Sequence, residues 1–412
     1  MGAGGRVARL RALMRAEGLD VCLVRRVSDL AWLTGFTGVF DAELAHTALV
    51  TQDACIIHTD SRYANAMRER ASGRRDVQSA EGAADAGADG YGGAGRTAGA
   101  ARAEAGKALE PDAPLWTVDD TVFHDGACPA PAAFAAHALA QMQMQDARLA
   151  VDEETPVSLF YALERALPDA HLVVRGGDVA SLRAVKDGAE IELMRAAQEC
   201  AEAGFTRMLE KLHVGMTQRE VSLALEFSIR EAGADALSFP NIVASGADGA
   251  NPHAQPGERR LERGDVVVFD FGARLAGYCS DTTRTVALGA PSPAHARAWD
   301  ALVEANGQVR RALRPGVTGR QMHELAEEVL ADAGFAGKMG HALGHGVGLD
   351  VHERPFLSSR EDKPLRAGNV VTVEPGVYIA GSFGMRLEDC GAVTDGGFEN
   401  FCTLPHELVV VE

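Results

Sequence analysis

Long apolar segments are missing from this sequence. No stretch approaches the ~20 consecutive apolar residues that a membrane-spanning helix needs. The N-terminal segment MGAGGRVARLRALMRAEG also lacks the apolar core of a secretory signal, and its pattern predicts an amphipathic helix instead. We therefore expect a protein that neither spans nor binds a membrane.

Positive charge is scarce as well. The chain has 40 Lys and Arg against 58 Asp and Glu, a formal net charge of −18 at pH 7. Such a balance disfavours nucleic acid and anionic membrane surfaces as partners, because both carry the same sign of charge.

Paired cysteine motifs are absent too. The seven cysteines are scattered, and none forms a C-x-x-C pair. An odd number of isolated cysteines predicts reduced thiols in a cytoplasmic protein. Cys279 and Cys390 stand close to acids discussed below, and we interpret both as small packing residues.

A chain of 412 residues is too long for one ordinary core, which predicts two domains, 1–178 and 182–412. Strand patterns such as GLDVCLV and ARLAVD alternate with helical segments in the first, which indicates an α/β fold. Within it, 19 of the 27 residues of 80–106 are Ala or Gly, so we expect a flexible insertion that catalysis does not need. Paired glycines predict a linker at 176–182.

The last third of the chain presents five side chains of metal-binding type, each in a distinctive setting. They are Asp270 in VVVFDFG, Asp281 in CSDTTRT, His345 in GHALGHGVGLDVHE, Glu374 in VTVEPGVY and Glu388 in MRLEDC. Any one of these acids alone is more often a turn or strand-end residue. As a set, four carboxylates and one imidazole suit two adjacent divalent cations, because carboxylates can bridge two ions and the imidazole favours transition metals.

Strand geometry brings these acids together in pairs. A hairpin centred between Leu275 and Ala276 would place Asp270 directly opposite Asp281. Directly opposed residues have Cβ atoms about 4.5–5.5 Å apart, close enough to hold neighbouring ions.

A second hairpin predicts the other pair. If its centre is Gly381, Glu374 lies opposite Glu388, and Arg386 shares the face of Glu388 because strand side chains repeat with period two. The sequence therefore predicts a buried cluster of four acids, which would repel one another strongly without cations.

These motifs resemble those of the pita-bread metallopeptidases, and in particular the Xaa-Pro branch with prolidase and aminopeptidase P. The resemblance covers about 182–411, through SFPNIVASGADGANPHA, GDVVVFDFGARLAGYCSDTTRTVALG, GHALGHGVGLDVHERP and VVTVEPGVYIAGSFGMRLED. It implies an α/β N-terminal domain like that of creatinase, followed by an α+β pita-bread catalytic domain.

The resemblance also implies a metal centre and an activity. Asp270 would bind one ion, Asp281 and Glu388 would bridge two, and His345 and Glu374 would complete the second site. The implied reaction is hydrolysis of the bond between an N-terminal residue and proline, through a hydroxide that bridges the two metals. Manganese is the favoured ion, with cobalt, zinc and iron as alternatives.

Further residues gain roles from the same resemblance. His253 and His352 would contact the substrate or the tetrahedral intermediate, and His341 would line the pocket for the proline ring. Arg386 would contact a carboxylate or orient a neighbouring ligand. Glu374 would also carry a proton to the leaving nitrogen. Taken alone, each histidine could be an ordinary loop residue.

Two other classes of function stay open at this point. One is a lyase-type metalloenzyme on the same scaffold, and the other is a catalytically inactive binding protein. The presence of all five ligand-type residues disfavours the second. The sequence does not separate a dipeptidase from an aminopeptidase, and the relatives predict a homodimer.

Overall fold

The computed structural model describes residues 2–36, 38–40, 45–72, 115–123 and 130–412. The predicted insertion at 80–106 lies outside these residues. The chain divides into two compact units, and the described part of the first ends at Arg183 while that of the second begins at Ala184. None of the described helices is long and apolar enough to cross a membrane.

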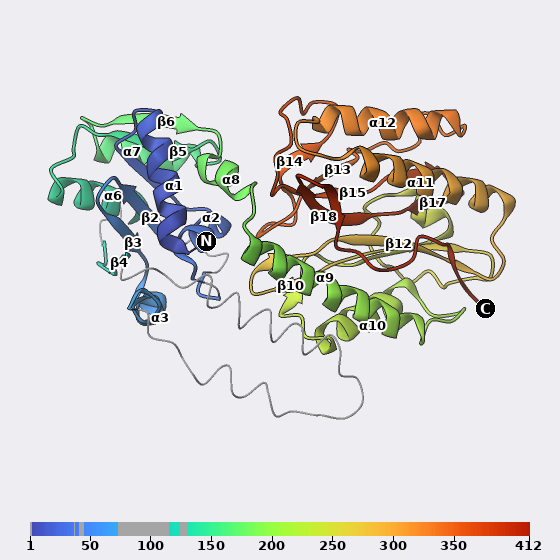
Figure 1. The fold of residues 1–412 in the computed structure, drawn as a ribbon. Coiled ribbons are helices and arrows are strands. Elements are labelled where there is room, and N and C mark those ends of the chain that lie inside the picture. The colour runs from blue at the N-terminus through green and yellow to red at the C-terminus, as the bar shows by residue number, and fades with distance from the viewer. Residues whose placement is uncertain (1, 37, 41–44, 73–114, 124–129) are drawn as a thin grey trace. The chain divides into compact units, whose positions relative to one another are not determined.

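Unit 1 is built around one mixed sheet with the strand order β4-β3-β2-β1-β5-β6 (Figure 1). Strand β1 pairs antiparallel with β2 and parallel with β5, and β5 pairs parallel with β6. The elements of this unit are α1 (Ala3–Ala16), β1 (Val21–Val24), α2 (Val27–Thr34), β2 (Thr47–Thr51), β3 (Cys55–His58), α3 (Ser61–Ala71), β4 (Thr117–Asp119), α6 (Ala130–Gln141), β5 (Arg148–Asp152), α7 (Val157–Ala166), β6 (His171–Arg175) and α8 (Asp178–Arg183).

Helix α8 occupies most of the segment for which the sequence predicted a linker. Its last residue, Arg183, is buried and pairs with Asp29 of α2 at 2.7 Å. The sequence predicts the domain boundary near 176–182, and in the structure Arg183 anchors the helix that fills most of this segment to unit 1.

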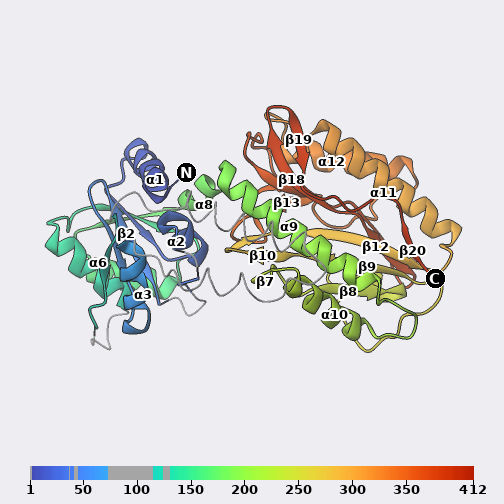
Figure 2. The same cartoon turned by 60° about the horizontal axis from the view of Figure 1, so that its bottom comes forward.

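Unit 2 carries two pairs of helices on opposite sides of its strands. Helices α9 and α10, drawn in green, cover one side, and α11 and α12, drawn in orange, cover the other in both views (Figures 1 and 2). The helices are α9 (Gly188–Leu209), α10 (Gln218–Glu231), the short 3-10 helix η1 (Gly246–Ala250), α11 (Pro293–Ala312) and α12 (Gly319–Asp332).

The strands of unit 2 form several small sheets. The two largest have the orders β20-β12-β9-β8 and β14-β13-β15-β18-β19. The strands are β7 (Ala236–Leu237), β8 (Ile242–Ser245), β9 (Val266–Phe271), β10 (Ala273–Leu275), β11 (Tyr278–Cys279), β12 (Thr282–Leu288), β13 (Gly344–Gly346), β14 (Glu353–Leu357), β15 (Val370–Val373), β16 (Gly376–Ile379), β17 (Phe383–Arg386), β18 (Asp389–Thr394), β19 (Gly397–Asn400) and β20 (Val409–Val411).

The helices of unit 2 begin where local sequence signals place them. The predicted capping box of Thr217 and Glu220 is confirmed at the start of α10, and Asp187 with Glu190 forms another before α9. Such a box satisfies two backbone N–H groups that have no partner within the helix. The apolar side chains of α9 and α10 then pack against β9 and β12, and those of α11 and α12 pack against β15 and β17.

A buried ion pair ties the start of unit 2 to the segment that carries His352. Lys186 Nζ lies 2.7 Å from the Glu353 carboxylate, and both side chains are almost completely buried. Removing one partner of a buried pair leaves an uncompensated charge, which typically costs about 3–5 kcal/mol. We expect Lys186→Met to destabilise unit 2 by about this amount in urea unfolding.

The double variant Lys186→Met/Glu353→Gln is the control for this prediction. It removes both charges, so it should recover a large part of the lost stability. A single variant as stable as the parent would show that the pair contributes nothing.

Candidate active site

One cavity of unit 2, about 330 Å³ in volume, is lined by every candidate site residue that the sequence predicted. Its wall also includes an apolar group that the sequence analysis did not propose: Phe239, Pro240 and Ile242. The predicted set, all on this wall, is His253, Asp270, Asp281, His341, His345, His352, Glu374, Arg386 and Glu388.

The side chains that could bind metal lie close together on the cavity wall. Single donor atoms of Asp281, His345 and Glu388 all lie within 4.8 Å of one another. The Nε2 atom of His345 is 3.6 Å from Oδ2 of Asp281 and 3.4 Å from Oε1 of Glu374. Donor atoms bound 2.0–2.2 Å from a common ion lie roughly 3–4 Å apart, so these separations suit shared cations.

Asp270 faces the same cavity but is held by a different partner. Its Oδ2 atom accepts a hydrogen bond from Arg386 Nη2 at 2.5 Å. Its Oδ1 atom is buried and has no hydrogen-bond partner among the described residues. A buried carboxylate oxygen without a donor is costly, and a bound cation would satisfy it.

The pairing of β9 with β12 corrects the first predicted hairpin. Asp270 lies opposite Thr283, not opposite Asp281. The turn falls at Ala276 and Gly277, with φ of 48° and 89°, which is the pattern of a type I′ turn. The predicted centre was one residue too early. This shifts the pairing by two residues, so the two aspartates share a face as diagonal neighbours.

The second predicted hairpin has the expected register. Gly376 pairs with Arg386 beyond the two glutamates, and Val373 pairs with Asp389 before them. Both pairings correspond to a hairpin centred on Gly381, which has a φ of 72°. Glu374 and Glu388 are thereby brought opposite each other.

Two threonines that the sequence analysis missed hold the carboxylates in place. Thr283 Oγ1 donates to Glu388 Oε2 at 2.7 Å, and Thr372 Oγ1 donates to Glu374 Oε1 at 3.2 Å. Each threonine stands two residues from a ligand-type residue, Asp281 or Glu374, on the same face of its strand. That period-two spacing was the available signal.

Arg386 is buried and bonded to protein groups on several sides. Besides Asp270, its guanidinium donates to Thr283 Oγ1 at 3.0 Å and to the Tyr378 hydroxyl at 2.7 Å. It therefore links Asp270 to the threonine that holds Glu388. This geometry suits an arginine that orients the carboxylates.

The three other histidines surround the carboxylates differently. The ring of His352 lies 4.2 Å from that of His345, and His341 Nε2 lies 3.1 Å from the Tyr378 hydroxyl. His253 is exposed on the cavity wall, and its ring has no hydrogen-bond partner among the described residues. Both His253 and His352 line the cavity.

Burial and mutual repulsion dominate the electrostatics of the site. Burial, reinforced by neighbouring carboxylates, raises the pKa of Asp281 and of Glu388 well above the ordinary values. Burial likewise raises the pKa of Glu374 to about 8, although Arg386 opposes the shift. Burial lowers the pKa of His345 to about 3, which leaves its imidazole neutral, as metal binding requires.

These observations fit a pair of divalent cations. The donor set is four carboxylates and one neutral imidazole, and one buried carboxylate oxygen lacks a donor. Cations would offset both the cost of burying these carboxylates and the repulsion between them, which together raise the pKa values. The residues present therefore match the two-metal centre that their types suggest.

A pH dependence of stability follows for the metal-free protein. The unfolded chain releases the protons of these carboxyl groups near pH 4, whereas folded Glu374 holds its proton up to about pH 8. The folded state therefore binds more protons across this window, and its stability falls as pH rises. Buried His341 and His345 oppose this trend up to about pH 6.5, because their pKa values are lowered and only the unfolded chain binds their protons there. We therefore expect the Tm of chelator-treated protein to drop between about pH 7 and pH 8.5 in calorimetry.

Manganese should raise the Tm most at the upper end of this window, where the carboxylates repel most strongly. In the metal-free state Glu374→Gln should show a shallower drop than the parent. A metal-free Tm that rises steadily over the window would contradict the prediction.

Comparison with known proteins gives consistent matches along the whole chain. Residues 192–395 match the model of metallopeptidase family M24, and residues 6–99 match that of the creatinase/prolidase N-terminal domain. An uncharacterized peptidase of Bacillus subtilis is 31% identical over 407 residues, which cover 98% of this chain and all of the relative. An Xaa-Pro dipeptidase of Lactobacillus delbrueckii is 34% identical over 257 residues, 62% of this chain and 70% of the relative.

Solved structures give the same picture. The Xaa-Pro dipeptidase of Bacillus anthracis aligns with a TM-score of 0.82 at 30% identity, over 99% of this chain and all of that one. The X-Pro aminopeptidase of Thermotoga maritima aligns with a TM-score of 0.76 at 30% identity, over 98% of this chain and all of that one. The expected architecture, a creatinase-like N-terminal domain before a pita-bread catalytic domain, is confirmed.

Proposed function

The chain belongs to metallopeptidase family M24, and from this premise we propose that it hydrolyses the peptide bond between an N-terminal residue and proline. The observation that carries the proposal is the single cavity in which five ligand-type residues meet three further histidines and an arginine. The protein is a metal-dependent Xaa-Pro peptidase. No feature of the site favours the lyase or the inactive binding protein.

Five residues would hold the ions: Asp270, Asp281, His345, Glu374 and Glu388. Metallopeptidases of this family use a dinuclear site for divalent metals. When bound, the ions supply Lewis acidity, which polarises a carbonyl and lowers the pKa of a water molecule. We propose manganese as the native ion because oxygen donors dominate the set, with cobalt, iron and zinc as alternatives.

The remaining polar residues of the cavity would act on the substrate. His253 and His352, which both line the cavity, would donate hydrogen bonds to the oxygen that becomes negative in the tetrahedral intermediate. Glu374 would hold the proton that the proline nitrogen must receive before it can leave. A carboxyl group can do so near neutral pH when burial raises its pKa, as it does for Glu374 in the metal-free protein.

Two further residues of the cavity complete the proposal. His341 lies on the cavity wall beside Tyr378 and would contact the proline ring. Arg386 would contribute mainly by fixing Asp270 and Thr283, since its described contacts are with protein groups.

We also propose a homodimer that works in the cytoplasm on proline-containing peptides. Support for a reducing compartment comes from the six cysteines of the described residues, which are all buried and unpaired by disulfides. Both a dipeptidase and an aminopeptidase stand among the similar structures, so the length of the preferred peptide is left to experiment.

The test is a peptidase assay of protein that has been freed of metal with a chelator and then reconstituted with Mn²⁺. Gly-Pro, Ala-Pro and the tripeptide Gly-Pro-Ala serve as substrates, with Gly-Ala and Ala-Ala as controls. We expect hydrolysis only of the Xaa-Pro bonds and only with metal. Equal rates on the Xaa-Ala controls, or full activity of the chelated protein, would refute the proposal. The ratio of dipeptide to tripeptide turnover distinguishes a dipeptidase from an aminopeptidase.

A further inference from the structure

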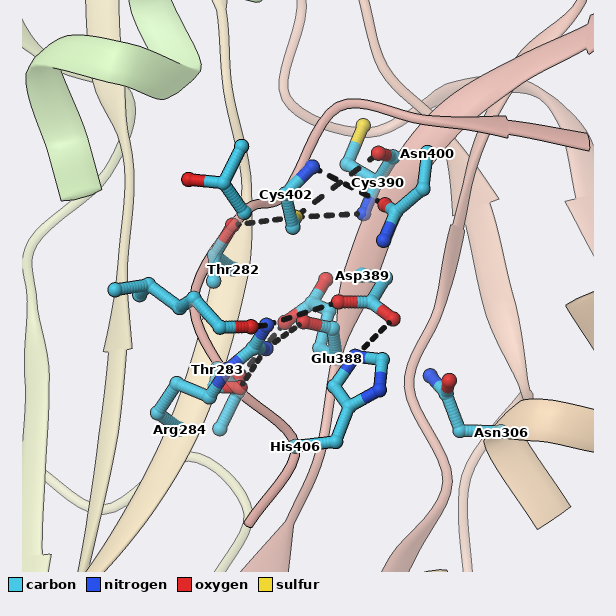
Figure 3. Close-up of polar contacts among 12 residues, drawn as sticks. Thr282, Thr283, Arg284, Asn306, Glu388, Asp389, Cys390, Asn400, Cys402 and His406 are labelled. Carbon is cyan, nitrogen blue, oxygen red and sulfur yellow. Dashed lines mark hydrogen bonds and ion pairs between the residues drawn. The ribbon is translucent and has the colours of Figure 1, made fainter. Parts of the chain in front are cut away.

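A second polar cluster contains Arg284, Asp389 and His406, which lie together beside Glu388 (Figure 3). Arg310, which pairs with Asp389, is its fourth member. Arg284 follows Thr283 on β12, so its side chain leaves the opposite face of the strand from the cavity. Arg284 and Asp389 are almost completely buried. Neither lines the cavity that holds the ligand-type residues.

The guanidinium of Arg284 donates hydrogen bonds to two backbone carbonyl groups, one on each of the two segments that carry proposed metal ligands. Its Nη1 atom donates to the carbonyl oxygen of Thr283 at 3.0 Å and to that of Glu388 at 2.5 Å. Thr283 is the residue whose hydroxyl holds the Glu388 carboxylate. Arg284 therefore holds the backbone of Glu388, a proposed bridging ligand, and the backbone of Thr283, which donates a hydrogen bond to the Glu388 carboxylate.

Asp389 holds the guanidinium in this position. Arg284 Nη2 lies 3.0 Å from Asp389 Oδ1 and also donates to the carbonyl oxygen of Leu404 at 3.0 Å. The other carboxylate oxygen of Asp389 receives Arg310 at 3.0 Å and His406 at 2.8 Å. The buried charges are therefore paired, and the arginine is held from several directions.

The contact also joins two separate sheets. Strand β12, which follows Asp281, belongs to one sheet, and β18, which follows Glu388, belongs to the other. The backbone amide of Glu388 donates to the Thr283 carbonyl at 3.1 Å, directly beside the guanidinium. The separation of the two carboxylates proposed to bridge the metals therefore depends on this junction.

We infer that Arg284 is a positioning residue of the metal centre: it sets the spacing of Asp281 and Glu388 from behind the sheet, with Asp389 as its anchor. The inference rests on the proposed metal centre. Arginine suits this task because its planar fork donates to several acceptors at once, whereas the ammonium of lysine acts as a compact point charge on a flexible stem. Loss of outer contacts that orient metal ligands typically weakens metal binding by about 10–100-fold.

The experiment compares Arg284→Lys with Arg310→Met in the full-length protein. Arg284→Lys keeps a positive charge near Asp389 but loses the fork. Arg310→Met removes a cation from the same carboxylate, yet Arg310 touches neither the Thr283 nor the Glu388 carbonyl. Titration of chelated protein with Mn²⁺ gives the affinities, the absorption spectrum of the Co²⁺-loaded protein reports ligand geometry, and metal-free Tm reports packing.

We expect Arg284→Lys to bind Mn²⁺ about 10–100-fold more weakly, to change the Co²⁺ spectrum and to lower kcat at saturating metal. Arg310→Met should keep the parental Co²⁺ spectrum and an Mn²⁺ affinity within about threefold of the parent, well below that loss. If Arg284→Lys lowers only the metal-free Tm, its role is packing and the inference is overturned. Equal loss of metal affinity in both variants would also overturn it, because charge balance at Asp389 would then be the cause.

Should Arg284→Lys fail to fold, Asp389→Asn takes its place, since the amide oxygen preserves one acceptor but not the charge that anchors Arg284. About tenfold weaker Mn²⁺ binding supports the inference, and parental binding overturns it. A parent protein that binds no divalent metal would instead refute the proposed metal centre, and this inference with it.

Discussion

Glu388→Gln is expected to keep the fold while losing bound metal and at least about 10³-fold in kcat. The substitution preserves the shape of the side chain but removes the charge that would bridge two ions. The metal centre supplies several kcal/mol of charge stabilisation in the transition state, and each 1.36 kcal/mol corresponds to a factor of ten in rate. Metal analysis of purified protein together with steady-state kinetics on Gly-Pro measures both effects.

In the metal-free state we expect the same substitution to preserve or raise the Tm. Burial and the charges of Glu374 and Asp270 raise the pKa of Glu388 well above its usual range. Its replacement by a neutral amide should therefore leave the chelated protein at least as stable as the chelated parent at pH 8. A ligand-site variant and a simply misfolded variant thus differ in the sign of the change in Tm.

Glu399→Gln is the matched control. Glu399 lies on the neighbouring strand β19, and its carboxylate is more than half exposed and pairs with Arg195. It should keep parental metal content and activity. Two ions and full activity in Glu388→Gln would exclude Glu388 as a bridging ligand.

The two hairpins show how well the local sequence predicts which residues of this site lie opposite each other. The glutamate hairpin was predicted in register because Gly381 stands at its centre and takes the positive φ that the turn needs. The aspartate hairpin turns one residue later than predicted, because Gly277 takes the positive φ of the second central position. A type I′ turn favours glycine at its second central position, so Ala276–Gly277 was the better choice.

The displaced turn does not change which face of the sheet the two aspartates share. Moving the centre of a hairpin by one residue changes the pairing by two, and side chains on a strand alternate with period two. Asp270 and Asp281 therefore stayed on one face, although their separation changed. A shift of the pairing by one residue would have sent one of them to the other side of the sheet.

Other parts of the site left no local pattern to detect. Arg386 contacts Asp270, which is 116 residues earlier in the chain, and Arg284 contacts Asp389 across 105 residues. Partners at such separations depend on how the two hairpins pack, which hydrophobic periodicity does not specify. The type of each residue was visible in the sequence, but its partner required the fold.

His253→Ala is expected to lower kcat by roughly 10²–10³ while metal content and KM stay near those of the parent. This is the loss typical for one hydrogen-bond donor to a developing oxyanion. The structure favours this role over a ligand role, because His253 lies on the exposed cavity wall and its ring is free of hydrogen-bond partners among the described residues. The metal-type donors cluster elsewhere, around His345.

His213→Ala is the control for a general effect of losing an imidazole, since His213 is exposed and absent from the cavity wall. It should behave like the parent. His253→Gln should recover part of the lost turnover because its amide can still donate a hydrogen bond. If His253→Ala loses its metals, His253 belongs to the ligand shell; if its kcat is unchanged, the oxyanion is stabilised without it. In that case His352, whose ring lies beside His345, is the other imidazole proposed to donate to the oxyanion and the next residue to replace.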